Sequence, residues 1–522
     1  MPTRRTACAM AALTIAATLG TGVAAPPPSV LQLADFLTLP ITGSPAGTGN
    51  NGSLARVNFL REEPGGRRLF VSDLNGPLYI VDKSTKQIAT YLDFNGAGER
   101  VGLFRRFTFA VGFAGGLITF QFDPDYAATG RFYTVHMEDV SIDAPKEPKA
   151  GSAPGLNAGG YTPTPAISTP GQVDREVVLI EWTDTSIRNT SFEGTAREVL
   201  RLQLNTRIHP MGDMIFNPSA RRGDAEWRVM YLSCGDGGSG EQRTAARANP
   251  QRLDTLVGKI LRIVPDPAEH TASSTISENG RYRIPRGNPF TGIDGARGEI
   301  WAYGLRNPHR LTWDDGRLFA STIGLHAWET VHLIRKGENH GYPLREGHQA
   351  MTDLNAMVPI PEDDVLPVRV SDTRTDGTIR PTYPVIEYPH QRGGGDAISG
   401  GFVYRGKKLP ALRGKFVFGD ISTGNVWFAD VKEMVAAGER KPSKPAPMQP
   451  LRIEWRGATH DSMWGVVLTA YRERGGQDAD LPGGSTVSGP GRVDMRFAVD
   501  ADGELYVLSK SDGMIRAVVG VR

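Results

Sequence analysis

The sequence predicts an all-β fold, a six-bladed β-propeller with long interblade loops. The 522 residues include 62 Gly and 37 Pro, a composition that favours many short strands and turns over long helices. Strand–turn–strand patterns recur six times, and the last four begin at His209, Arg306, Gly400 and Arg492, at steps of 97, 94 and 92 residues. Repeats at such regular spacing indicate a propeller, whereas a two-sheet sandwich would be too small to hold them.

Each hairpin is predicted from two apolar or alternating runs with a turn between them. In chain order the hairpins are 55–81, 117–135, 209–236, 306–320, 400–420 and 493–508. Four of them are marked by the turns Asn75-Gly76, Asp123-Pro124, Asp314-Asp315-Gly316 and Asp500 to Gly503, which use the residues that tolerate tight backbone turns.

The remaining segments are predicted as connections. Residues 26–53 are expected to form a loose leader into the fold. Residues 143–172 and 361–380 are rich in Pro, Gly, Ser, Thr and Asp, which predicts surface loops. Residues 254–264 and 426–437 are compatible with strands or with short helices, and their pattern does not decide between the two.

The N-terminus predicts export. Arg4 and Arg5 precede an apolar run over residues 7–19, which is followed by small residues up to Ala25. This is the layout of a secretory signal peptide, assigned to residues 1–25, and the run is too short for a comfortable membrane span. Residues 26–522 are expected to form a single propeller domain that is periplasmic or secreted, with no membrane span.

Charge and cysteine content narrow the possible partners and sites. The formal net charge is +2 and the basic residues are dispersed, so nothing suggests a nucleic-acid partner. Cys8 lies in the predicted signal peptide, which leaves Cys234 as the single cysteine of the mature chain and excludes an intrachain disulfide. Because Cys234 lies on an apolar strand, we expect a buried structural thiol.

A candidate catalytic pair lies in the third hairpin. His209 stands just before one predicted strand, and Asp236 ends the next one within a Gly-Asp-Gly-Gly run. If the two strands pair antiparallel, these residues meet at the same edge of the sheet. A carboxylate beside an imidazole fixes its tautomer and raises its basicity, as a general base requires. The alternative interpretation is a hydrogen-bonding loop histidine beside a plain Gly-Asp turn.

Arg306 is predicted to share this site. It precedes the first strand of the fourth hairpin, just as His209 precedes the first strand of the third. Neighbouring blades of a propeller bring such equivalent positions to the same mouth of the central channel. The alternative is an arginine that caps loop carbonyls.

Taken in order, the motifs resemble the soluble quinoprotein glucose/sorbosone dehydrogenase family, the aldose sugar dehydrogenases that use pyrroloquinoline quinone (PQQ) and calcium. The resemblance runs from about Ala55 to the C-terminus. Its most specific pieces are residues 304–308 (Gly-Leu-Arg-Asn-Pro), 235–238 (Gly-Asp-Gly-Gly), 329–343, 400–406, 412–414 and 418–420.

The resemblance implies a role for several residues. His209 would be the base that takes the proton from the anomeric hydroxyl of the sugar, and Asp236 would orient it. Arg306 would stabilise negative charge on the reduced quinone, and Asn307 would contact the cofactor. Hydride would pass from C1 of an aldose to PQQ and leave a lactone. Calcium is implied as well, without side-chain ligands that the sequence identifies.

Some positions depart from the family pattern. His309 stands where the family has a glutamine contact, and Met211-Gly212-Asp213 stands where Gly-Gly often follows the histidine. Arg492 and Arg496 are the candidates for the cofactor-clamping arginines of the last blade, although a one-residue shift would turn them to the opposite face of the strand. No lysine matches the cofactor-binding lysine of the fifth blade.

Two other functions therefore remain open beside a quinone-dependent dehydrogenase. The first is a cofactor-less propeller of the same fold that binds a carbohydrate or a protein. The second is a metal-dependent hydrolase or lactonase, for which Asp213, Asp236 and Asn307 are the evident candidate ligands.

Overall fold

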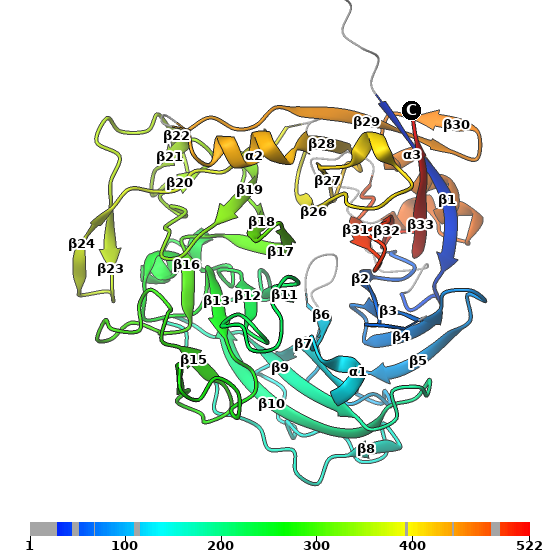
Figure 1. Cartoon of the computed structure of the whole chain (residues 1–522), viewed down its shortest axis with the longest axis horizontal. Coiled ribbons are helices and arrows are strands. Elements are labelled where there is room, and N and C mark those ends of the chain that lie inside the picture. The colour runs from blue at the N-terminus through cyan, green and yellow to red at the C-terminus, as the bar shows by residue number, and fades with distance from the viewer. Residues whose placement is uncertain are drawn as a thin grey trace, which may run out of the picture.

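The structure is a computed structural model, and it describes residues 29–43, 52–66, 68–108, 115–391, 395–440, 443–481 and 491–522. Strands dominate these residues, and their sheets stand around a common centre in chain order (Figure 1). This arrangement confirms the predicted β architecture. The predicted signal peptide, residues 1–25, lies outside the described residues.

Four sheets are built from strands that lie close together in the sequence, and each contains one of the first four predicted hairpins. In chain order they hold β2 (Val57–Glu62), β3 (Arg68–Asp73), β4 (Pro77–Asp82) and β5 (Ile88–Asp93); β6 (Leu117–Phe122), β7 (Arg131–Asp139), β9 (Arg175–Asp184), β10 (Glu193–Leu204) and β8 (Gly155–Asn157); β11 (Met211–Phe216), β12 (Met230–Cys234), β13 (Lys259–Ile263) and β16 (Ile300–Tyr303); and β17 (Asn307–Asp314), β18 (Arg317–Ile323), β19 (Trp328–Ile334) and β25 (Ile386–Pro389).

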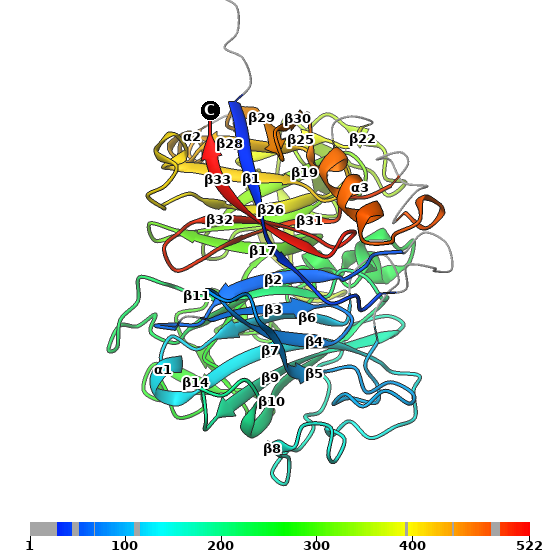
Figure 2. The ribbon, with the colours of Figure 1, turned by 90° about the vertical axis from the view of Figure 1, so that its right-hand side faces the viewer.

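A larger sheet joins the N-terminal and C-terminal segments. Its strand order is β26 (Ile398–Val403), β27 (Lys415–Asp420), β28 (Val426–Asp430), β29 (Met448–Trp455), β1 (Ser29–Thr38), β33 (Met514–Val521), β32 (Leu505–Ser509) and β31 (Met495–Val499), with β30 (Ala458–His460) paired to β29. β1 runs parallel to β29 and antiparallel to β33, beside which it lies in Figure 2.

The strand β1 corrects one prediction. Residues 26–53 were expected to be a loose leader, but Ser29–Thr38 is a ten-residue strand with Leu31, Leu33 and Leu37 buried. Its partners lie more than 400 residues further along the chain, so no hairpin pattern near it could announce the pairing.

The inner strands form a closed ring. β2, β6, β11, β17, β26 and β31 are the innermost strands of successive sets, each contacts the next, and β31 returns to contact β2. Gly212 allows two of them to approach, because a Cβ at this position would lie 2.6 Å from Cα of His309. The ends of these strands therefore surround one central space.

Shorter elements fill the connections. They are β14 (Ser274–Ile276), β15 (Arg283–Pro285), β20 (Arg345–Glu346), β21 (Gln349–Met351), β22 (Met357–Val358), β23 (Leu366–Arg369), β24 (Thr375–Ile379), the helices α1 (Tyr126–Thr129), α2 (Val431–Ala437) and α3 (Met463–Glu473), and the 3-10 turns η1 (Ser239–Glu241), η2 (Ala245–Gln251), η3 (Pro410–Leu412) and η4 (Asp478–Asp480). None of the described helices is long and apolar enough to cross a membrane.

These elements refine the predicted connections. The predicted loop 143–172 contains the short strand β8, and the predicted loop 361–380 contains the β23–β24 hairpin, much of which is exposed. Of the two undecided segments, 254–264 contains β13, and 426–437 contains β28 followed directly by α2. Short strands that pair only with each other bury little apolar surface, so they carry a weak hydrophobic pattern.

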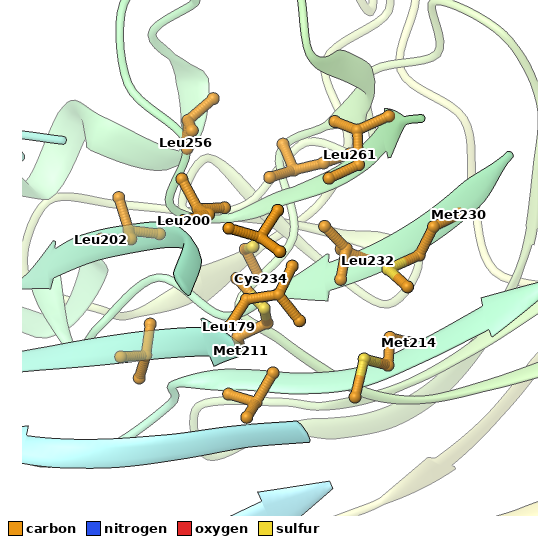
Figure 3. Close-up of a cluster of buried hydrophobic side chains, with 14 of the residues drawn as sticks. Leu179, Leu200, Leu202, Met211, Met214, Met230, Leu232, Cys234, Leu256 and Leu261 are labelled. Atoms are coloured by element: carbon orange, nitrogen blue, oxygen red, sulfur yellow. The ribbon is translucent and has the colours of Figure 1, made fainter. Parts of the chain in front are cut away.

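The core behind the third sheet is built from apolar side chains of several strands. Met211, Met214, Leu232 and Cys234 point into it, as Figure 3 shows. Cys234 is 1% exposed, which confirms the predicted buried thiol, and burial raises the pKa of this thiol to about 12. Cys234 is thus part of the apolar packing that fixes β11 and β12. The candidate catalytic residues lie next to these strands, one just before β11 and the other just after β12.

Candidate active site

A cavity of about 850 Å3 lies at the end of the ring where β11 and β17 begin. Each inner strand, or the segment just before it, contributes side chains to its wall. The predicted residues on this wall are His209, Arg306, Asn307, His309, Arg492 and Arg496. Residues from three separate sheets are therefore brought to one site, as the propeller prediction required.

His209 and Asp236 form a direct pair. β11 and β12 are antiparallel with Met211 opposite Cys234, so the residue before one strand meets the loop after the other. Nδ1 of His209 lies 2.7 Å from Oδ1 of Asp236. The predicted juxtaposition is thus confirmed, and His209 reaches it with a left-handed backbone, φ 52°.

Asp236 is held as a buried carboxylate. It is 0% exposed, and it accepts N–H hydrogen bonds from Gly238 at 2.8 Å and Gly240 at 2.9 Å. Burial alone would raise the pKa of Asp236, but the charge and hydrogen bond of His209 outweigh burial and lower it. In the neutral form of the imidazole, the ionised Asp236 holds the proton on Nδ1, which leaves Nε2 as a proton acceptor.

Arg306 is a fixed cation on the same wall. Its Nη1 donates to the carbonyls of Gly324 and, at 3.2 Å, of Ile323, while its Nη2 pairs with Glu241. Burial would lower the pKa of Arg306, but the charges of Glu241 and other neighbours raise it. The backbone carbonyl of Arg306 accepts the N–H of Asp236 at 2.7 Å, which ties the third sheet to the fourth.

Glu241 is a site residue that the sequence did not predict. It ends the 3-10 turn η1, and its Oε1 lies 3.8 Å from Nε2 of His209 while it pairs with Arg306. The side chain is 30% exposed and lines the cavity. Glu241 lies five residues after Asp236 in a glycine-rich loop, where no periodic pattern indicates which way a side chain points. It reaches the cavity only because of the path that η1 follows.

Basic side chains gather on one part of the wall. Arg492, Arg496 and Lys510 come from β31, β32 and the residues next to them, Arg310 comes from β17, and Asp494 lies among them. Nη2 of Arg492 lies 3.3 Å from Asp494, whereas the buried Nε atoms of Arg492 and Arg496 have no hydrogen-bond partner in the described chain. Burial lowers the pKa of Arg496 to about 10, a value at which the guanidinium stays charged in neutral solution.

Arg492 and Arg496 both reach the cavity despite the expected shift of register. Arg492, Asp494 and Arg496 all line the cavity, whereas Val493 and Met495 belong to the apolar cluster behind them. The side chains thus alternate from Arg492 to Arg496, although Asp494 has a left-handed backbone with φ 54°.

Lys510 was also missed. It is 3% exposed, lines the cavity, and its amine makes no hydrogen bond or ion pair with any part of the chain described here. It follows β32 much as Asp236 follows β12, and this equivalence of strand ends is the signal that could have identified it. Burial and the charge of Arg496 lower the pKa of Lys510.

Asn307 and His309 occupy the start of β17. Asn307 is 8% exposed and lines the cavity. His309 also lines it, but its Nε2 donates to the carbonyl of Ile398 at 2.7 Å. Burial and the charge of Arg310 lower the pKa of His309 well below its usual range, so this imidazole is neutral and engaged.

The candidate metal ligands do not come together. Asp213 pairs with Arg61 at 2.8 Å and accepts the N–H of Leu311 at 3.0 Å, and it is not part of the cavity wall. Asp236 is committed to His209. Across the described ranges, no group of three or more His, Cys, Asp or Glu side chains is placed to hold a metal ion.

Sequence comparison identifies a family for most of the chain. The sequence profile of the family described as "Glucose / Sorbosone dehydrogenase" matches residues 57–446. The HIPL1 protein of Arabidopsis thaliana is 26% identical over 492 residues, which cover 90% of this chain and 62% of that protein. The aldose sugar dehydrogenase YliI of Escherichia coli is 27% identical over 233 residues, which cover 44% of this chain and 46% of YliI. The chain thus spans less than two thirds of the length of these relatives.

Solved structures share the fold. The soluble aldose sugar dehydrogenase of Escherichia coli, in its apo-form, aligns over 91% of this chain and 98% of its own, with a TM-score of 0.54 and 17% identity. The PQQ-bound form of an aldose sugar dehydrogenase from Streptomyces coelicolor aligns over 95% and 99%, with a TM-score of 0.50 and 17% identity. At this identity the likeness concerns the backbone arrangement.

Proposed function

The chain belongs to the glucose/sorbosone dehydrogenase family, and from this premise we propose that it is an exported, quinone-dependent sugar dehydrogenase. It oxidises the anomeric C1 hydroxyl of an aldose to a lactone by hydride transfer to PQQ. The observation that carries the proposal is the His209–Asp236 pair, which shares one cavity with Arg306 and a cluster of basic side chains.

His209 acts on the sugar in this proposal. Its Nε2, left free of the proton by the bond from Nδ1 to Asp236, takes the proton of the C1 hydroxyl as hydride leaves C1. Asp236 stabilises the imidazolium that forms, and because it is buried and held by two backbone N–H groups, it keeps the ring in place. PQQ, when bound, supplies the two-electron acceptor for the hydride.

The basic wall fits the chemistry of PQQ, a flat tricyclic molecule with three carboxylates. Arg492, Arg496 and Lys510 carry buried or nearly buried nitrogen atoms without partners in the described residues, and such groups are costly unless an anion satisfies them. Arg306 also keeps a buried Nε without a partner. We assign these four residues to the anionic groups of the cofactor, with Asn307 as a neutral contact.

Calcium has no assigned ligand, because the described side chains do not form a metal-binding group, and no step depends on the ion. Removal of calcium with a chelator, followed by titration with PQQ, would show whether the ion contributes to cofactor binding.

We also infer that residues 26–522 form one six-bladed β-propeller. The closed order of contacts among the inner strands β2, β6, β11, β17, β26 and β31 supports six units. The large sheet divides at the parallel β1–β29 pair into two sets of four, one from β26 to β29 and one made of β31, β32, β33 and β1. β1 would then be the outer strand of the last blade.

A cofactor-less binding module is the second candidate. The observation that favours it is the ion pair between Arg306 and Glu241, since the cation expected to face the cofactor already has a carboxylate partner. His309 is likewise engaged with a backbone carbonyl. In this case the cavity would bind a sugar or a protein segment without PQQ.

One experiment separates the two candidates. Purified protein without residues 1–25 is titrated with PQQ in the presence of calcium, and reduction of a redox dye is followed across a panel of aldoses. We expect PQQ binding, seen by absorbance, and dye reduction with at least one aldose. Absence of any PQQ binding would defeat the quinone-dependent function and leave the binding module.

Variants test the assigned roles. His209→Ala should lower turnover by about 10²- to 10⁴-fold, the usual contribution of a general base. Asp236→Asn and Arg306→Ala should lower turnover while the circular dichroism spectrum is retained. His348→Gln is the control, because His348 forms an imidazole–carboxylate pair with Glu387 at 2.8 Å outside the cavity. A His209→Ala variant as active as the parent would refute the role of the base.

A further inference from the structure

A second imidazole–carboxylate pair faces the same cavity. His390 directly follows β25 and lines the cavity wall, and its Nε2 forms a hydrogen bond with Oε1 of Glu329. Glu329, on β19, is 0% exposed. The arrangement repeats that of His209 and Asp236, in which a buried carboxylate lies behind an imidazole that reaches the cavity.

Backbone groups, and not a cation, hold Glu329. The N–H of Gly324 donates to its Oε1 at 3.1 Å, and the N–H of Ile398 donates to its Oε2 at 2.7 Å. Within the described ranges, the one ion pair of Glu329 is with His390. The carboxylate therefore has no permanent positive partner, and a proton on His390 is what balances its charge.

The pair retains a proton near neutral pH. Burial raises the pKa of Glu329 to about 7, against the lowering effect of the hydrogen bond from His390. Burial would lower the pKa of His390, but the hydrogen bond and charge of Glu329 outweigh burial and raise it. Glu346 and Asp396 act on His390, and Asp420 and the buried hydroxyl of Tyr388 face Glu329; the three carboxylates favour the protonated state of the pair.

The pair lies on the side of the cavity assigned to the electron acceptor. Gly324 links it to Arg306, because the carbonyl of Gly324 accepts from Arg306 while its N–H donates to Glu329. Asp396, which acts on His390, lies 3.6 Å from Nη1 of Arg492. His390 is thus linked to Arg306 through Glu329 and Gly324 and to Arg492 through Asp396, whereas His209 is linked to Arg306 through Glu241 and is held by Asp236 of the third sheet.

We propose that His390, paired with Glu329, delivers a proton to the electron acceptor, while His209 takes one from the sugar. The inference rests on the proposed dehydrogenase function. Oxidation at C1 breaks a C–H and an O–H bond: the hydride goes to the acceptor and the proton to Nε2 of His209. Neutral two-electron reduction requires one further proton at the acceptor, which the imidazolium of His390 supplies. Water then takes the proton from His209 and returns one to His390, so that two electrons and two protons are accounted for.

The test compares His390→Gln with His348→Gln, which removes an imidazole–carboxylate pair outside the cavity. Equal PQQ affinity in both variants, measured by absorbance, would show that the cofactor site is intact. The rate of the first turnover with an aldose is then measured across pH. An acid must be protonated to act, so the parent rate should fall as pH rises through the pKa of the pair. His390→Gln should lose this alkaline limb and be about 10²-fold slower, at the lower end of the usual contribution of a general acid.

A second readout needs no cofactor. In ligand-free protein with 13C-labelled histidine, the resonance missing from His390→Gln identifies His390, and Glu329→Gln should lower its titration midpoint. An unchanged midpoint would overturn the pairing. If the parent is active and the pH profile of His390→Gln is the same as that of the parent, the role of His390 is wrong while the proposed dehydrogenase function stands. A parent that oxidises no aldose would refute the proposed function, and the role of His390 would fall with it.

Discussion

The carboxylate of Glu241 lies beside both the guanidinium of Arg306 and the imidazole of His209. Its Oε1 pairs with Arg306 and lies 3.8 Å from Nε2 of His209. At this distance two opposite charges interact by about 4 kcal/mol at an effective dielectric of 20, and by less where water reaches them. Glu241 therefore opposes the binding of an anion beside Arg306.

Replacement of Glu241 should show the size of this effect. Glu241→Gln keeps the shape of the side chain and removes its charge, so an anionic ligand no longer competes for Arg306. We expect PQQ to bind roughly tenfold more tightly, equivalent to about 1.4 kcal/mol, in an absorbance titration. Glu241→Asp, which keeps the charge, is the control and should bind PQQ like the parent. Equal affinity in the two variants would show that the charge of Glu241 does not oppose the ligand.

At the scale of elements, periodic hairpins were predictable and returning loops were not. The pairing of β11 with β12 follows from apolar runs and a turn, and it was enough to place His209 beside Asp236. Glu241 and His390 reach the cavity through η1 and through the segment after β25, whose paths depend on neighbouring sheets. No pattern within those segments records that dependence.

The sheet partners of β1 could not be predicted from the sequence either. Its alternating leucines indicate an extended segment, but a partner hundreds of residues away leaves no local mark.

The second sheet contains a buried ionic network that should make stability depend on acid. Arg201 donates to Glu138 at 2.6 Å, to Glu176 at 2.8 Å and to Glu198 at 2.9 Å, and Arg201 and Glu138 are fully buried. Burial would raise the pKa of Glu138, but the hydrogen bond from His136 and the charge of Arg201 lower it to about 2.

The sign of the effect follows from this lowered pKa. Glu138 stabilises the folded chain above the ordinary carboxyl pKa, and this contribution is lost as pH falls toward about 2; it amounts to about 3 kcal/mol. In urea unfolding between pH 6 and pH 3, Glu138→Gln should show a shallower loss of unfolding free energy than the parent. Glu278→Gln, at a side chain 85% exposed, is the control and should keep the parent slope. Equal slopes for all three proteins would contradict the assignment.

At the scale of the whole molecule, the cavity exists because the ring is closed. Arg492, Arg496 and Lys510 belong to the β31–β33 set, whereas His209 and Arg306 belong to the third and fourth sheets. β31 contacts β2 on one side and β26 on the other, and so closes the ring. β1 attaches that set to β29 through both of its edges. Destabilising β1 should therefore lower the unfolding free energy of the whole molecule, and not only the stability of a single loop.

Leu31 is the residue that tests this coupling. It is 0% exposed on β1, in the apolar cluster that also contains Leu451 of β29 and Val518 of β33, so Leu31→Ala leaves a cavity where the N-terminal and C-terminal segments meet. We expect the unfolding free energy to fall by about 2–5 kcal/mol. The basic wall depends on the closure of the ring by β31, so the temperature at which PQQ binding is lost should fall together with the midpoint of the fluorescence transition. Ala34→Ser, on the exposed side of the same strand, should leave both transitions unchanged. A Leu31→Ala protein that loses binding and structure at separate temperatures would mean that the last set of strands opens independently of the ring.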